Sequence, residues 1–126
     1  MNVVDSSGWI EYAADEENAD FFERPISDRD NLLVPTVCIY EVFKRVLREF
    51  GEERALEVIG QMSLGEVVEL DRQIAINAAQ ISTELKLAMA DSIILATARL
   101  RNATLWTQDE HFKDLDGVKY IEKKYS

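Results

Sequence analysis

The sequence has little of what stabilises small secreted proteins or marks disordered ones. Cys38 is the only cysteine in 126 residues, so an intrachain disulfide and a cysteine zinc cluster are both excluded. A single cysteine suits a reducing cytoplasm, which is the location we expect. Only 5 glycines and 2 prolines are present, while 47% of the residues are hydrophobic. This composition argues against disorder and predicts one compact domain over residues 1–126.

Long apolar runs and positive charge are also scarce. No run approaches the roughly 20 apolar residues that span a bilayer, and the first five residues do not resemble a signal peptide, so we expect no membrane association. The 24 acidic and 14 basic residues give a net charge of −10. A protein that coats nucleic acid needs a basic surface, so that class is disfavoured. A nuclease whose acidic site binds cations is still compatible with this charge.

Short β-branched segments alternate with helical patterns along the chain. Strands are predicted at 2–5, 32–34, 66–70, 103–107 and 118–121. Helices are predicted from residue 9, over 16–23, over 37–50 with Thr36 as the N-cap, over 52–62, over 72–85 and from residue 90, and Pro25 is expected to end the second. The last of these is apolar nearly all round and should be buried. The alternation predicts an α/β domain with a mostly parallel five-stranded sheet flanked by helices.

Four acidic residues, Asp5, Glu41, Asp91 and Asp109, lie at informative positions in this pattern. Asp5 and Asp109 follow predicted strands, Asp91 begins a helix, and Glu41 lies one turn into another. Ligands of open α/β sheets bind at the carboxyl ends of the strands, so we expect these side chains to share one crevice. Taken singly, the aspartates could cap turns or helices, and Glu41 could pair with Arg45. Gathered together, they would repel one another unless a divalent cation lay among them.

The segments around these acids carry a family resemblance. They are Val3-Val4-Asp5-Ser6-Ser7, the helix that contains Glu41, Met89–Ala98 and Leu105–Phe112. In order, spacing and total length they resemble PIN domains, particularly the toxins of VapBC type. The resemblance covers the whole chain and implies helices around a five-stranded parallel sheet. It also implies a Mg²⁺- or Mn²⁺-dependent ribonuclease in which Asp5, Glu41, Asp91 and Asp109 are the metal-binding and catalytic residues.

Other site positions follow from the same resemblance. Ser6 and Thr107 match positions that often supply a nearby polar contact, whereas Gln108 departs from the basic residue that many relatives carry there. A water activated by the cation would attack the phosphodiester, and no protein nucleophile is needed. The only histidine, His111, is interpreted as a turn residue rather than a catalytic base.

The resemblance also implies partners: an RNA substrate, a second copy in a homodimer, and a cognate antitoxin whose tail blocks the acidic site. Aromatic residues that could line an antitoxin groove are Trp9, Tyr12, Phe21, Phe22, Phe43 and Phe50, and we expect at least half of them to be core. Lys44, Arg45 and Arg48 share the helix of Glu41 and are predicted to guide the RNA backbone.

Other classes of protein fit less well. A receiver domain needs an acidic pair after the first strand, and a haloacid-dehalogenase-type phosphatase needs an aspartate where Ser7 stands. The remaining alternative is a catalytically inert PIN scaffold that binds protein or RNA without cleaving it. The presence of all four acids favours the nuclease, because an inert scaffold does not need them together.

Overall fold

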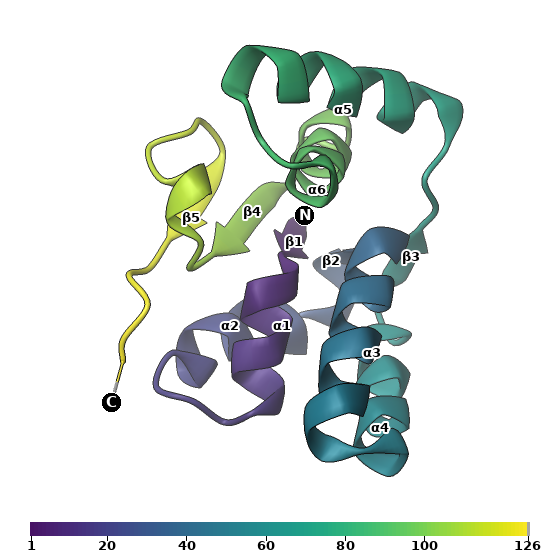
Figure 1. The fold of residues 1–126 in the computed structure, drawn as a ribbon, viewed down its shortest axis with the longest axis vertical. Helices are drawn as coiled ribbons and strands as arrows, with labels where there is room; N and C mark the ends of the chain where they lie inside the picture. Colours follow the sequence, from purple (N-terminus) through teal and green to yellow (C-terminus); the bar gives the residue numbers. More distant parts are fainter. Residues whose placement is uncertain (126) are drawn as a thin grey trace.

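The computed structural model describes residues 1–125, which form a single parallel sheet with helices around it (Figure 1). The strands are β1 (Asn2–Val4), β2 (Leu32–Pro35), β3 (Glu66–Val68), β4 (Thr104–Thr107) and β5 (Val118–Tyr120). All of their pairings are parallel, and their order across the sheet is β3-β2-β1-β4-β5. The predicted α/β class and five-stranded parallel sheet are confirmed.

Six α-helices connect the strands in the described part of the chain. They are α1 (Ser6–Ala13), α2 (Ala19–Ser27), α3 (Thr36–Phe50), α4 (Glu52–Met62), α5 (Arg72–Leu85) and α6 (Met89–Leu100), with short 3₁₀ turns η1 (Arg29–Asn31) and η2 (Glu110–Phe112). Successive helices pack as pairs, and Figure 1 shows α5 and α6 at one end of the molecule and α1 to α4 at the other. None of these helices is both long and apolar enough to cross a membrane.

The core includes residues from all six helices and the sheet, and α6 packs against β1 and β4 within it. Every residue from Ser92 to Ala98 is buried, which confirms that α6 is the buried helix. Burying this much apolar surface is the main favourable term in folding. Among the aromatic residues considered for a groove, Trp9 and Phe22 are fully buried in the core. Tyr12, Phe21 and Phe43 pack against it partly buried, and Phe50 is exposed.

Several predicted boundaries were wrong. The first helix begins at Ser6, because the Asp5 carboxylate caps it by accepting a hydrogen bond from the Gly8 N–H. The second begins at Ala19 and continues through Pro25 to Ser27, so the burial of Pro25 and its neighbour Ile26 outweighs the backbone hydrogen bond that proline cannot donate.

Two further boundaries differ from prediction. Thr36 is the first residue of α3 and makes no capping hydrogen bond, because the extended Pro35 already occupies the N-cap position. The strand predicted at 66–70 ends at Val68, after which Leu70 is exposed.

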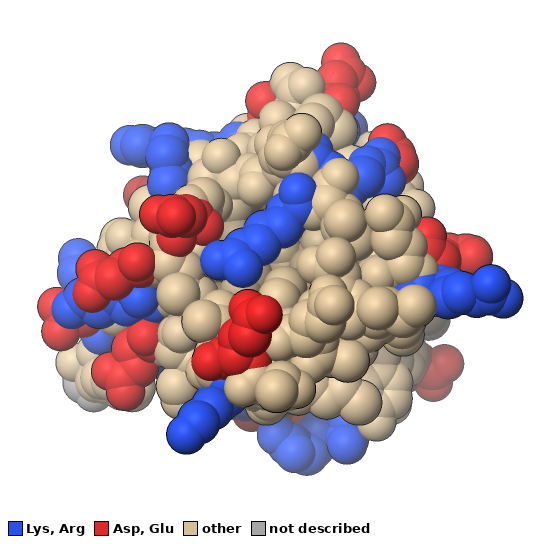
Figure 2. All heavy atoms as spheres, turned by 90° about the horizontal axis from the view of Figure 1, so that it is seen from above, with Lys and Arg blue, Asp and Glu red and all other residues tan. Residues whose placement is uncertain are grey.

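Charge is mixed across the surface despite the acidic excess. Figure 2 shows the molecule from the side of α5, and there acidic and basic side chains alternate around a large uncharged area. The excess of carboxylates is therefore not concentrated on this face, and the acidic pocket described next is a separate local feature.

Candidate active site

The candidate active site lies where the strand order reverses. From β1 the chain proceeds through β2 to β3 on one side, while β4 and β5 lie on the other. Ligands of open α/β sheets bind beyond the carboxyl ends of the strands at such a point. The Asp5 N–H donates to the Trp106 carbonyl at 3.1 Å, which ties the carboxyl ends of β1 and β4 together. Asp5 and Asp109 consequently emerge at the same edge of the sheet.

All four acids predicted from the sequence line one pocket of about 360 Å³. Asp5 comes from the end of β1, Glu41 from α3, Asp91 from the first turn of α6, and Asp109 from the turn after β4. The other lining residues are Ser6, Ser7, Ile10, Glu11, Arg45, Gln108 and Lys123. The prediction that these acids converge on one crevice is borne out by the geometry.

Asp5 accepts more hydrogen bonds than any of the other three acids of the pocket. It is only 3% exposed, and its Oδ1 accepts from the Gly8 N–H and the Ser7 hydroxyl, both at 2.9 Å. Its Oδ2 accepts from the Thr107 hydroxyl at 2.6 Å, and the same hydroxyl accepts from the Asp109 N–H at 2.9 Å. Burial raises the pKa of Asp5 to about 7, although these hydrogen bonds favour the charged form.

Gly8 is required for this arrangement. A Cβ at this position would lie 2.6 Å from the Phe22 ring and 2.7 Å from a Val4 methyl group. Glycine therefore lets the first turn of α1 approach β1 and α2 closely enough for its N–H to reach Asp5.

Asp91, Asp109 and His111 form the tightest group of possible metal ligands in the described residues. One ligand atom from each lies within 4.8 Å of the others. The His111 Nδ1 is 3.1 Å from Asp109 Oδ1. Burial, followed by the charges of Asp109 and Glu41, raises the pKa of Asp91 to about 6, while His111 acts in the opposite direction. Nearby carboxylates that disfavour ionisation in this way are typical of functional sites.

The position of His111 is one that the sequence interpretation missed. The side chain is exposed, as expected for a turn residue, but it also reaches the acidic cluster. Asp109 accepts from the His111 N–H at 2.9 Å, so the turn brings the imidazole back toward the carboxylate. The signal available in the sequence was the Asp-x-His spacing directly after a strand.

Glu41 joins the pocket through Ser6, whose hydroxyl donates to Glu41 Oε1 at 2.6 Å. The alternative pairing of Glu41 with Arg45 is wrong, because Arg45 pairs with Glu49 one turn further along α3. Glu41 is therefore left facing the other acids without a salt bridge in the described residues.

A second set of polar residues was also missed. Glu11 on α1 is 2% exposed and accepts from the Lys123 ammonium at 2.8 Å, the Asn18 N–H at 3.0 Å and the Gln108 side-chain amide at 3.1 Å. Burial works to raise the pKa of Glu11, but these hydrogen bonds and the Lys123 charge outweigh it and hold the pKa below its usual value. Lys123 follows the last strand, and no periodic pattern there predicts that it lies near α1.

The donor set suits a hard divalent cation. Carboxylate oxygens are the ligands that Mg²⁺ and Mn²⁺ prefer, and the Asp91 carboxylate accepts no hydrogen bond from the described residues. A cation would also relieve the repulsion that raises the pKa of Asp91. The residues present therefore fit a metal of this type.

Fold and site together define a single-domain α/β protein with an acidic, metal-compatible pocket at the switch point of a parallel sheet. The family model for the PIN domain matches residues 3–118, and the chain belongs to this family. A search of curated proteins found no significant match.

Solved structures agree on the fold. A chain of a toxin–antitoxin complex from Klebsiella pneumoniae is 22% identical, with a TM-score of 0.79 over 94% of this chain and 96% of that one. DNA-bound VapBC from Salmonella typhimurium matches at 22% identity and a TM-score of 0.74, over 97% and 98% of the two chains. VapC20 from Mycobacterium tuberculosis, described as a toxin that cleaves the sarcin–ricin loop, is 15% identical to this chain. Its TM-score is 0.74, over 89% of this chain and 92% of that one.

Proposed function

We propose that this protein is a divalent-metal-dependent ribonuclease that acts as the toxin of a toxin–antitoxin pair. The observation that carries the proposal is the gathering of Asp5, Glu41, Asp91 and Asp109 in one pocket of a PIN domain. Such a cluster is unfavourable for folding alone, because burial and mutual repulsion raise the pKa of Asp5 and Asp91.

The side chains of the pocket divide into metal-holding and positioning groups in this proposal. Asp5, Glu41, Asp91 and Asp109 would together hold Mg²⁺ or Mn²⁺, and Asp91 and Asp109 offer ligand atoms within 4.8 Å of each other. When bound, the cation would supply positive charge that activates water and offsets charge developing on the phosphate. Thr107 positions Asp5 and the backbone of Asp109 through its hydroxyl, and Ser6 positions Glu41.

The partners belong to the same proposal. RNA is the proposed substrate, and a cognate antitoxin and a second copy of this chain are the proposed protein partners. Support comes from the structural neighbours, which include a toxin–antitoxin complex and a DNA-bound VapBC assembly of nearly the same chain length. We propose that the protein acts in the cytoplasm, where its RNA substrate would be.

The test is cleavage of RNA by the purified protein in Mg²⁺ and in Mn²⁺, with sequencing of the cut ends. We expect cleavage that EDTA abolishes and excess Mg²⁺ restores. An Asp91→Asn preparation made in parallel controls for contaminating nucleases. Equal cleavage by both preparations would contradict the proposal.

The inert PIN scaffold is the competing function. It predicts RNA or protein binding without cut ends under any metal condition. It also predicts that Asp91→Asn leaves binding intact, because the acids would then have no ligand to hold.

A further inference from the structure

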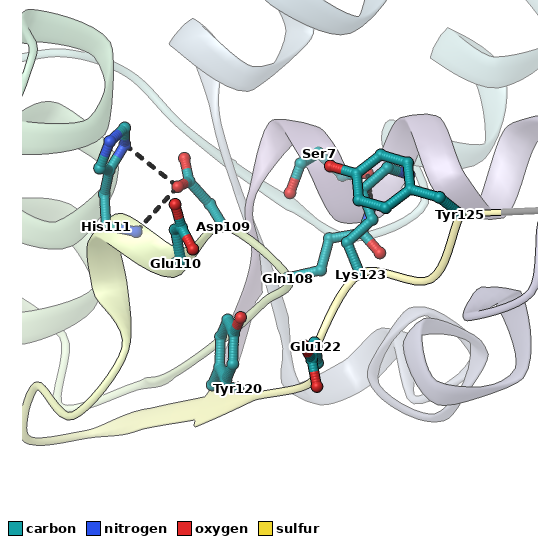
Figure 3. A pocket seen from close by; sticks show the side chains of 9 residues that line it. All are labelled: Ser7, Gln108, Asp109, Glu110, His111, Tyr120, Glu122, Lys123 and Tyr125. Carbon is teal, nitrogen blue, oxygen red and sulfur yellow. Dashed lines mark hydrogen bonds and ion pairs between the residues drawn. The ribbon is translucent and has the colours of Figure 1, made fainter.

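A second pocket opens beside the acidic one. Its volume is about 400 Å³, and it shares Ser7, Gln108, Asp109 and Lys123 with the acidic pocket, so the two are adjacent. The rest of its lining is Glu110, His111, Tyr120, Glu122 and Tyr125 (Figure 3). We call this second cavity the base pocket. Its size is in the range of small-molecule sites.

The wall between the two pockets is held by buried hydrogen bonds. Asn18 is 2% exposed, and its side-chain amide donates to Gln108 Oε1 at 2.9 Å and to the Glu122 carbonyl at 3.0 Å. Gln108 and Lys123 both donate to the buried Glu11 carboxylate. The segment after β5 is thereby fixed to α1 and to the turn before α2, so the base pocket is a built feature of the fold.

The lining of the base pocket offers flat rings and hydrogen-bond acceptors. Figure 3 shows Tyr120 and Glu122 on one side of Gln108 and Tyr125 on the other, with Glu110 beside Asp109. The side chains of Glu110 and Glu122 have no hydrogen-bond or ion-pair partner among the described residues, so both carboxylates are free to accept. A ligand that fits must be flat, must carry N–H donors and must not be anionic where it enters.

A nucleobase meets these requirements, and a phosphate does not. Bases of single-stranded RNA stack on tyrosine rings and are recognised through hydrogen bonds to their edges. Guanine presents N1–H and N2–H side by side, which matches the two oxygens of one carboxylate. Uracil presents two carbonyl oxygens flanking its single N–H, and these would face the same carboxylates unfavourably.

We propose that the base pocket binds a guanine base next to the phosphodiester that is cut, with Tyr120 as the stacking surface and Glu110 and Glu122 as acceptors. This inference rests on the proposed ribonuclease function, because the acidic pocket has to hold the neighbouring phosphate. Because Gln108 and Asp109 line both pockets, a base and the phosphate next to it could occupy the two cavities together. The pair of pockets would then select where an RNA is cut.

The first test is cleavage of a random-sequence RNA library with sequencing of the cut ends. We expect the wild-type protein to favour guanine at one position adjacent to the cut. The double variant Glu110→Gln, Glu122→Gln keeps side-chain size but leaves one acceptor oxygen per residue, and should lower this preference about tenfold. Glu53→Gln, an exposed glutamate of α4 outside both pockets, is the matched control and should keep the wild-type preference. A wild-type profile in the double variant would overturn the inference.

A second test does not need cleavage. The metal-free wild-type protein is titrated with each of the four nucleosides and followed by NMR of the backbone amides near Tyr120 and Glu122. Guanosine should shift these signals at lower concentration than uridine, and the double variant should lose the difference. If guanosine binds but no RNA is cut, the ribonuclease function fails and the pocket assignment stands. If RNA is cut with no guanine preference, and guanosine and uridine bind alike, the pocket assignment fails.

Discussion

The two sides of the acidic pocket are built differently. On the β1 side, both Asp5 oxygens accept hydrogen bonds from groups that are themselves fixed, namely the Gly8 N–H and the hydroxyls of Ser7 and Thr107. On the α6 side, Asp91 accepts no hydrogen bond from the described residues and faces Asp109 and Glu41 instead. The exposed His111 donates to Asp109 on this side, and the Ser6 hydroxyl donates to Glu41.

The difference indicates a division of labour. The Asp5 side closes the sheet edge and caps α1, so it contributes to the fold as well as to the field of the site. On the other side, the Asp91 carboxylate accepts no hydrogen bond from the described residues, and its repulsion with Asp109 and Glu41 is unfavourable without a positive ligand. Substitutions at Asp5 should therefore change stability as well as activity, whereas substitutions at Asp91 should change mainly activity.

The largest effect is expected from Asp91→Asn. The change removes a charge from the side that lacks hydrogen bonds, so cleavage in Mg²⁺ should fall on the order of 100-fold or more. Metal-free stability should stay equal or rise, because the repulsion with Asp109 and Glu41 is relieved. Cleavage rates are measured with a labelled RNA. The control is Asp30→Asn, because Asp30 is exposed and lies outside the pocket. A purified Asp91→Asn protein that cuts at the wild-type rate would remove Asp91 from the site.

The next effect is a dependence of stability on pH in EDTA. The pKa of Asp5 is raised from 3.8 to about 7 and that of Asp91 to about 6, so between pH 4 and 7 the folded protein binds more protons than the unfolded chain. Their contribution to the unfolding free energy must fall as pH rises through that window and level off above it. Other groups titrate in the same pH range, so the quantity to compare is the difference in unfolding free energy between the wild type and Asp5→Asn.

That difference should change by on the order of a few kcal/mol across the window, with the wild type losing more stability as pH rises. Urea denaturation at pH 5 and pH 8 measures it. Parallel curves for the two proteins would show that Asp5 titrates normally.

A smaller effect is expected from Thr107→Val. The variant keeps the shape of a fully buried side chain but removes the donor to Asp5 and the acceptor for the Asp109 N–H. The unfolding free energy should fall by about 1–3 kcal/mol, the cost of leaving buried polar groups unpaired. Thr107→Ser keeps the hydroxyl and should lose less. A serine variant less stable than the valine variant would show that the methyl group matters more than the hydrogen bonds.

Some parts of this pocket could be predicted from the sequence and others could not. Strand and helix periods and the parallel topology place Asp5, Asp91 and Asp109 at one edge, because each lies at a strand end or helix start. Contacts made by chain segments without periodicity could not be found this way. The Lys123–Glu11 bond depends on the path of the chain after β5, and the approach of His111 depends on the turn geometry of η2. Pro25 predicts a helix end from sequence alone, and the burial that offsets its lost hydrogen bond is a tertiary effect that the sequence pattern does not show.

The smallest effect should come from the rim, where Arg45 borders the acidic pocket on the side of Glu41. Its side chain is 46% exposed and pairs with Glu49, and Arg48 lies exposed on the same helix. We predict that these arginines guide the RNA backbone, as phosphate contacts that add affinity without sequence choice. The double variant Arg45→Ala, Arg48→Ala should weaken RNA binding several-fold. It should also reduce the slope of log affinity against log salt concentration by roughly 1 to 2, because each lost phosphate contact lowers the number of counterions released on binding by about one.

Binding is measured by fluorescence anisotropy across a salt series with a labelled RNA, in the Asp91→Asn background so that the RNA stays intact. Arg24→Ala, Arg72→Ala is the matched control, because both residues are exposed and neither lines the acidic pocket. Metal affinity should equal that of the Asp91→Asn parent in both arginine double variants, because no arginine is a ligand. An unchanged affinity and slope would mean that Arg45 and Arg48 only solvate α3 or pair with Glu49. Loss of antitoxin binding with RNA binding intact would instead place this rim at the protein interface.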